Sequence, residues 1–296
     1  MSSVEGHVLL IESSDLLEDD MGMLAATQVT DGISDAHCCH LFAYPPSVHH
    51  ATTANHVEEG EEVIPGHITH VAIFSNMTWL PQYLLNDYSS LTSIDLTHVP
   101  HIQYVLHSFL MGCNGLESID LSPLSKVGEV YPSFLRRCDS LKSIDLSPLS
   151  QISWISDSFL QGCRGLTSID LSPFVQLTEI GASFLSGCSG LKSIDLSPLS
   201  QVDEVGNSFM EGCSGLSAID LSPLSKVMDI KESFFEGCSG LLSIDLSPMS
   251  DSIGVRRFFL QGCKGLKRID FTPQPQVTGI GWSFSMGPSA SPPSHN

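Results

Sequence analysis

Residues Leu191–Gly215 read LKSIDLSPLSQVDEVGNSFMEGCSG, and units of the same pattern recur in register from Leu91 onward. Each unit has 25 residues, and eight units make up residues 91–290. A repeat of this length is typical of a solenoid, in which each unit buries its apolar face by stacking on its neighbours. The sequence therefore predicts a solenoid over about two-thirds of the chain.

The first part of the unit has the pattern of a short strand. Ile194 and Leu196 alternate with Ser193, Asp195 and Ser197, which is the period of a half-buried strand. Proline follows at once in seven of the eight units, and since it has no N–H it ends the strand. We therefore expect a parallel β-sheet on the concave face of the solenoid, with short helical or 3₁₀ turns on its convex face.

A row of phenylalanines marks the second part of the unit, where position nineteen never varies. The eight residues are Phe109, Phe134, Phe159, Phe184, Phe209, Phe234, Phe259 and Phe284. We expect them to form a second spine of the core, on a helical or 3₁₀ turn that ends at Gly-Cys-x-Gly.

The succession of Phe209, Cys213, Leu216, Ile219 and Leu221 resembles the BspA-like class of leucine-rich repeats. The near-identical wording SFLxGCSGLxSIDLSPLS is most similar to trypanosomatid leucine-rich repeat proteins, and the resemblance covers about residues 66–290. The unit departs from the class by an extra residue between Phe and Cys and by leucine in place of the turn asparagine. The resemblance implies a leucine-rich-repeat solenoid that binds a ligand or partner and carries no catalytic residues.

Two further segments precede the regular units. Residues 66–90 read as a degenerate capping unit, with Val71 and Ile73 in its strand. Residues 1–65 form an acidic, His-rich leader that we expect to be largely flexible, with Leu9–Leu17 and Met21–Ala26 as candidate short helices.

The leader contains a tract of possible zinc ligands, His37-Cys38-Cys39-His40. Adjacent cysteines do not match the usual C-x₂₋₄-C spacing of zinc sites, so we predict no metal there. At the C-terminal end, the last unit departs from the repeat pattern before the flexible tail that we expect at residues 291–296. We expect an open sheet edge there, through which the chain can self-associate.

The charge balance excludes several function classes. The net charge is −20, and residues 1–90 hold 13 acidic side chains but no Lys or Arg. Such a chain repels nucleic acid and anionic membrane surfaces. The sequence shows no convincing secretory signal, no apolar stretch that spans a bilayer and no enzyme motif. We therefore predict a non-enzymatic, cofactor-free, cytoplasmic protein, with a cell-surface location as the alternative.

Seven cysteines recur at one position of the unit. They are Cys113, Cys138, Cys163, Cys188, Cys213, Cys238 and Cys263. Stacked units place such residues about 5 Å apart, which a disulfide tolerates. Their odd number and apolar surroundings favour buried free thiols instead.

The residue that draws most attention is an aspartate that recurs once per unit. The Asp row consists of Asp95, Asp120, Asp145, Asp170, Asp195, Asp220, Asp245 and Asp270. It is the candidate binding site of the chain, because its side chains face outward from the strands. Neighbouring carboxylates about 5 Å apart repel by roughly 1 kcal/mol in water, so something must offset the repulsion.

Several offsets and roles for the Asp row stay open at this point. Serine hydroxyls can donate to the carboxylates, Lys142, Lys192 and Lys267 can neutralise some of them, and protons can be shared with raised pKa values. The row is then a structural network, a contact for a basic protein partner, or a site for calcium.

Variable positions are the candidates for specificity. Tyr104, Glu129, Trp154, Glu179, Glu204 and Asp229 share one position of the unit, and Trp154 is a candidate interaction anchor. The leading hypothesis is a protein-interaction scaffold that uses the concave or lateral surface of the solenoid. The alternative is a cell-surface adhesin or antigen.

Overall fold

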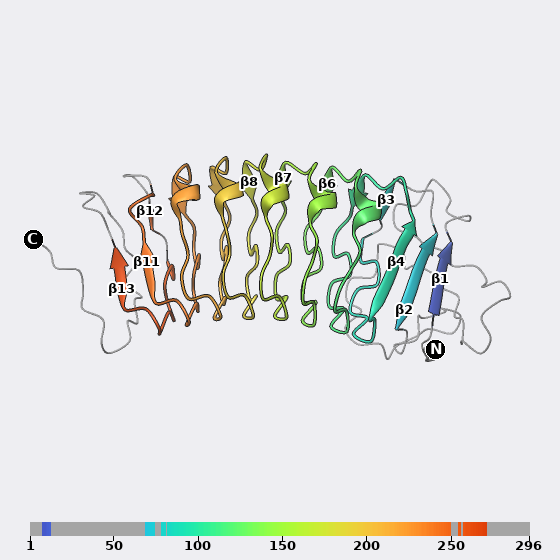
Figure 1. The fold of residues 1–296 in the computed structure, drawn as a ribbon, viewed down its shortest axis with the longest axis horizontal. Helices are drawn as coiled ribbons and strands as arrows, with labels where there is room; N and C mark the ends of the chain where they lie inside the picture. Colours follow the sequence, from blue (N-terminus) through green and yellow to red (C-terminus); the bar gives the residue numbers. More distant parts are fainter. Residues whose placement is uncertain are drawn as a thin grey trace, which may run out of the picture.

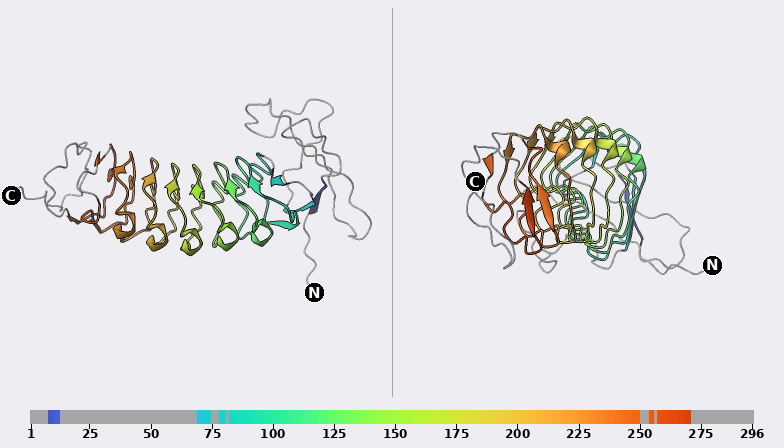
Figure 2. Two further views of the ribbon diagram at one scale, coloured as in Figure 1. Left: turned by 90° about the horizontal axis from the view of Figure 1, so that it is seen from above. Right: turned by 60° about the vertical axis from the view of Figure 1, so that its left-hand side comes forward.

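The chain winds into one elongated solenoid of about eight turns (Figure 1). The computed structural model describes residues 8–12, 69–74, 78–80, 82–249, 254–255 and 257–270. Seen from two further directions, the turns follow one another along a single axis (Figure 2). The predicted solenoid of parallel strands is thereby confirmed, and within the described residues its helical turns are all 3₁₀.

The longest strands lie at the two ends of the described solenoid (Figure 1). Near the N-terminus, β1 (Val8–Glu12), β2 (His70–Phe74) and β4 (Ser93–His98) form a parallel sheet in that order. Near the C-terminus, β11 (Ser243–Asp245) pairs in parallel with β13 (Arg268–Asp270).

The leader contributes β1 to this architecture. Each residue of Val8–Glu12 pairs in register with a residue of β2, so this stretch is a strand where the sequence allowed a short helix. The rest of the leader, including Met21–Ala26 and the His37–His40 tract, lies outside the described residues. In β2, Val71 and Ile73 are both buried, as expected for the strand of the degenerate unit.

Between these ends, the predicted strand is reduced to an extended segment. Individual backbone hydrogen bonds join successive units there. Examples are the bond from the Lys142 N–H to the Glu117 carbonyl, of 3.0 Å, and that from the Lys192 N–H to the Thr167 carbonyl, of 3.1 Å. A regular strand in every unit was therefore wrong for these turns.

The 3₁₀ turns stack along one rim of the solenoid, at Ser-Pro-Leu or Ser-Pro-Phe (Figure 1). They are η1 (Ser122–Leu124), η2 (Ser147–Leu149), η3 (Ser172–Phe174), η4 (Ser197–Leu199) and η5 (Ser222–Leu224). The prediction of a helical turn at the phenylalanines was wrong, since the described phenylalanine turns contain no helix. Proline explains the actual position, because its fixed φ and missing N–H suit the first residues of a helical turn.

A second row of strands follows the 3₁₀ turns, and the sequence analysis did not predict it. We call these the return strands: β3 (Trp79–Leu80), β5 (Tyr104–Val105), β6 (Glu129–Val130), β7 (Trp154–Ile155), β8 (Glu179–Ile180), β9 (Glu204–Val205), β10 (Asp229–Ile230) and β12 (Gly254–Val255). They pair in parallel in the orders β3-β5-β6, β7-β8-β9 and β10-β12. Two residues are too few to give a visible alternation in the sequence.

The phenylalanine row forms the predicted spine of the core. From Phe109 to Phe234, its members at position nineteen have no exposed surface, and successive ring centroids lie 4.8 to 6.3 Å apart. Phe284 lies outside the described residues. Each ring stands on a turn with positive φ angles, such as 60° at Ser183, 54° at Leu185 and 76° at Gly187. The turn is therefore left-handed in part and is not a 3₁₀ helix.

Candidate functional site

The aspartates of the Asp row are exposed, except for the half-buried Asp270. In every unit from Asp95 to Asp245, Oδ1 accepts a hydrogen bond of 2.8 to 2.9 Å from the backbone N–H two residues later. This is an Asx turn, and in five units it leads directly into the 3₁₀ turn.

The Asx turn accounts for the local hydrogen bonding of the unit. In the Asp195 unit, the carboxylate takes the N–H of Ser197, Pro198 has no N–H, and Leu199 donates to the carbonyl of Leu196 at 2.8 Å. The Ser197 N–H is therefore not available to a strand ladder, which explains why the predicted strand stops so early. The aspartate recurs because the turn needs an acceptor at this place.

The pKa shifts in the Asp row run opposite to the expected raised values. The hydroxyl and the backbone N–H of the following serine lower the pKa of Asp145, Asp195 and Asp220. The same two groups, with the backbone N–H first, lower the pKa of Asp95 and Asp245, where they belong to Thr97 and Ser247. Repulsion from the preceding aspartate is the smallest of the causes at Asp220 and Asp245. Shared protons with raised pKa values are thus wrong for these five residues, whereas serine donation is confirmed.

The predicted lysine partners contribute little to the lowered pKa values of the Asp row. Lys142 forms its ion pair with Glu117 at 2.5 Å, in the preceding unit, and not with Asp145. No lysine is among the causes of the lowered pKa at Asp145 or Asp195. At the C-terminal end, Arg268 binds Asp270, with 2.7 Å between Nε and Oδ1.

Asparagine and alanine in the Asp row should have different effects, because only asparagine keeps a side-chain acceptor. We expect the variant with Asp145, Asp170, Asp195 and Asp220 changed to Asn to melt near the wild-type temperature at pH 7. The same four changes to Ala should lower the melting temperature clearly, as measured by circular dichroism. Equal losses in both variants would show that the charge, and not the acceptor, is what the turn requires.

The pH dependence follows from the lowered pKa values. A carboxyl whose pKa is lower in the folded state stabilises the fold above its ordinary value of 3.8, and this contribution is lost as the pH falls through the folded value. We therefore expect wild-type stability to fall below about pH 4. The Asn variant should lose less over the same range, and an unchanged acid transition would contradict the assignment.

The return strands of the early units present two exposed aromatic side chains, Trp79 and Tyr104. The return-strand row comprises Trp79, Tyr104, Glu129, Trp154, Glu179, Glu204 and Asp229. Trp79 and Tyr104 are register partners and each is 38% exposed, while Tyr104 is in turn the partner of Glu129. Trp154, the expected anchor, is half-buried. Sequence reasoning missed Trp79 because it lies in the degenerate unit.

The seven cysteines form a column of free, buried thiols, as predicted. Each Sγ donates to a carbonyl of the preceding turn at 3.1 to 3.2 Å, for example Cys188 to Leu160 and Cys213 to Leu185. We call this column the thiol ladder. It joins successive units, so the thiols are hydrogen-bond donors as well as small apolar side chains.

Comparison with known families agrees with this geometry. A family model described as BspA type leucine rich repeat region (6 copies) matches residues 66–176 and 153–283. The chain belongs to this family. The BspA-type repeats thus include the degenerate unit as well as the regular ones, and they account for the stacked turns described above.

Solved leucine-rich repeat structures are similar to this BspA-type chain at low identity. A leucine-rich repeat protein of T. pallidum is 21% identical, with a TM-score of 0.43, and the match covers 51% of this chain and 65% of that one. One from Bacteroides ovatus is 18% identical, with a TM-score of 0.40, over 69% of this chain and 73% of the other. No curated protein is significantly similar to this chain.

No three His, Cys, Asp or Glu side chains in the described ranges are grouped so that they could hold a metal ion. Among the same residues, no helix has the length and apolarity to cross a membrane.

Burial makes the thiol ladder of the BspA-type repeats unreactive. It raises the pKa of Cys138, Cys188 and Cys238 to about 12 and that of Cys263 to about 11. In a variant with Cys38 and Cys39 changed to Ser, we expect no reaction with DTNB in the native state and seven reactive thiols in denaturant. A fast-reacting thiol in the native protein would contradict the buried ladder.

Proposed function

We propose that this protein is a non-enzymatic scaffold that binds a protein partner along the outer surface of its solenoid. The observation that carries the proposal is the exposure of Trp79 and Tyr104 on rigid, paired strands. Aromatic residues of this kind dominate the binding energy of protein interfaces. The residue type at this position of the unit differs from one unit to the next. Such variation is what a surface that recognises one particular partner requires.

The division of labour between the rows supports the same proposal. The phenylalanines fill the core, the cysteines join the turns, and the aspartates accept the Asx-turn hydrogen bonds. Each invariant row therefore has a structural task, which leaves the variable return-strand row for recognition. The finer resemblance to trypanosomatid leucine-rich repeat proteins stays a prediction, and so does contact of a basic partner with the Asp row.

Affinity capture on the folded chain tests the proposal. The wild type and the variant with Asp145, Asp170, Asp195 and Asp220 changed to Asn serve as baits, and any captured protein is identified, purified and titrated against both by calorimetry. We expect one partner that rebinds both baits with a defined stoichiometry. If no captured protein rebinds the purified chain, the scaffold function is wrong. If only the wild type binds, the Asp row is the binding surface.

A further inference from the structure

The most informative surface outside the repeat framework is the first part of the return-strand row, from Trp79 to Glu204. It begins with two exposed aromatic side chains and continues into acidic ones, since Glu179 and Glu204 are both exposed and are register partners. Neighbouring parallel strands lie about 4.8 Å apart, so the two carboxylates stand side by side.

The return segments that form this surface carry acidic side chains but neither lysine nor arginine. The return segments 78–82, 103–107, 128–132, 153–157, 178–182 and 203–207 contain no Lys or Arg. They do contain Glu129, Asp157, Glu179, Asp203 and Glu204. Among the described residues, no cationic partner is bound to Glu179 or Glu204.

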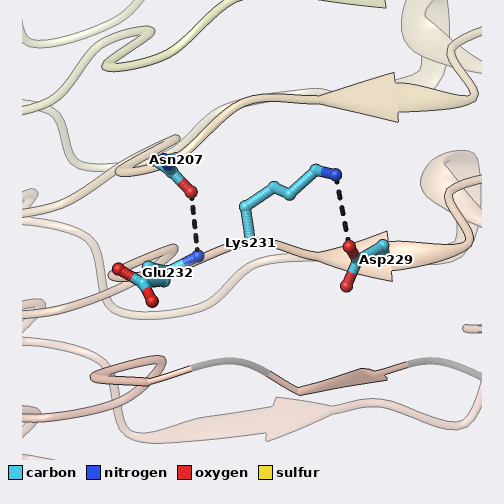
Figure 3. Close-up of polar contacts among 4 residues, drawn as sticks. All are labelled: Asn207, Asp229, Lys231 and Glu232. Atoms are coloured by element: carbon cyan, nitrogen blue, oxygen red, sulfur yellow. Dashed lines mark hydrogen bonds and ion pairs between the residues drawn. The ribbon is translucent and has the colours of Figure 1, made fainter.

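The first basic residue on the return segments is already occupied. Lys231 lies in the next unit, and its Nζ is 3.2 Å from Oδ2 of Asp229 (Figure 3). Both side chains are largely covered, and the neighbouring Glu232 donates its backbone N–H to Oδ1 of Asn207 at 3.1 Å (Figure 3). Lys231 is therefore held away from the exposed carboxylates of the earlier units.

We propose that this surface binds an extended, arginine-rich segment of a protein partner, which lies along the solenoid axis and crosses the return strands. The proposal rests on the scaffold function above and names the surface and the partner chemistry. Guanidinium groups stack on Trp and Tyr faces and also pair with carboxylates, so one type of side chain suits both halves of the surface.

The length of the surface sets the length of the segment. Five steps of about 4.8 Å separate the Trp79 unit from the Glu204 unit, which makes about 24 Å. An extended chain rises about 3.3 Å per residue, so about seven residues span the surface. The arginines near one end of the segment meet Trp79 and Tyr104, and those near the other end meet Glu179 and Glu204.

Fluorescence anisotropy with a labelled octa-arginine peptide at low ionic strength tests the proposal in the full chain. We expect binding by the wild type. Changing Glu179 and Glu204 to Gln should weaken it about tenfold. The matched control changes Asp170 and Asp195 to Asn, which removes the same charge from the Asp row of the same two units, and it should weaken binding less than about twofold.

A second pair of variants tests the aromatic half. Changing Trp79 and Tyr104 to Ala should weaken binding about five- to tenfold. Val175 and Leu242 are 57% and 48% exposed and are not part of a return strand, so changing both to Ala should leave binding unchanged. Circular dichroism melts verify that each variant is folded.

Several results would overturn the proposal. One is that the wild type does not bind octa-arginine. Another is that the Gln variant and its Asn control lose the same affinity, which would indicate attraction by overall charge. If a captured natural partner binds normally to both return-strand variants, the scaffold function stands but this surface is not its site. If octa-arginine binds as expected but no natural partner is found, the scaffold function is the part that fails.

Discussion

Replacing Phe209 with alanine is expected to lower the free energy of unfolding by about 4 kcal/mol. Phe209 has no exposed surface, and its ring centroid lies 5.4 Å from that of Phe184 and 4.8 Å from that of Phe234. The change removes a large buried side chain and two ring contacts, and the stacked turns on either side cannot close the gap without leaving their own register. Urea denaturation followed by circular dichroism measures the loss.

The matched control for Phe209→Ala is Phe258→Ala. Phe258 is 39% exposed, and its loss should cost less than about 1 kcal/mol. Comparable losses at the two positions would mean that the phenylalanine row does not carry the core. A solenoid is stabilised by contacts between neighbouring units, so a break at Phe209 should loosen the units around it before those that hold Trp79 and Tyr104.

The sequence predicted what depends on periodicity alone. Stacking of identical units requires that an apolar position be buried in every unit, so Phe209 and Cys213 could be placed in the core from the repeat. The same reasoning showed that the cysteines are free thiols, because neither their number nor their surroundings favoured disulfides.

The backbone between the core positions could not be predicted in the same way. Pro198 was read as the end of a strand, but no regular strand precedes it in this unit, and it is the second residue of a 3₁₀ turn. That turn depends on a bond from the Ser197 N–H to the Asp195 carboxylate, a contact between near neighbours that the alternation of apolar and polar residues does not reveal. The two-residue return strands are invisible for the same reason.

The candidate site shows that the invariant aspartate has a structural cause, while its contact with a partner stays a prediction. Asp195 recurs because a turn needs its oxygen, and recurrence within one chain reports what every unit must do to fold. Recognition of one partner requires units that differ from one another. Trp79, Tyr104 and Glu179 differ at one equivalent position, and the structure places that position on exposed, paired strands.

Replacing Gly190 with alanine is expected to destabilise the fold by about 3 kcal/mol, through contact alone. A Cβ at Gly190 would lie 2.3 Å from the Arg164 carbonyl oxygen and 2.7 Å from that of Leu166, both in the backbone of the preceding turn, where one unit joins the next. Neither oxygen can move aside as a flexible side chain would, so the two turns must separate. The φ of Gly190 is not in the left-handed region, which leaves the contact as the cause.

Gly187 is the matched control, because alanine there would be disfavoured by the backbone conformation and not by a close contact. A Cβ there would meet nothing closer than 3.4 Å, but the φ of 76° costs an alanine about 1–2 kcal/mol. Gly190→Ala should therefore be the more damaging of the two in urea denaturation, and the reverse order would show that turn conformation, and not the distance between turns, limits the stack. Ser140 occupies the position of Gly190 in its own unit, so the stack admits a side chain there. If close packing of turns is the constraint, Ser140→Gly should stabilise the protein, since it lets that pair of turns approach as closely as the others.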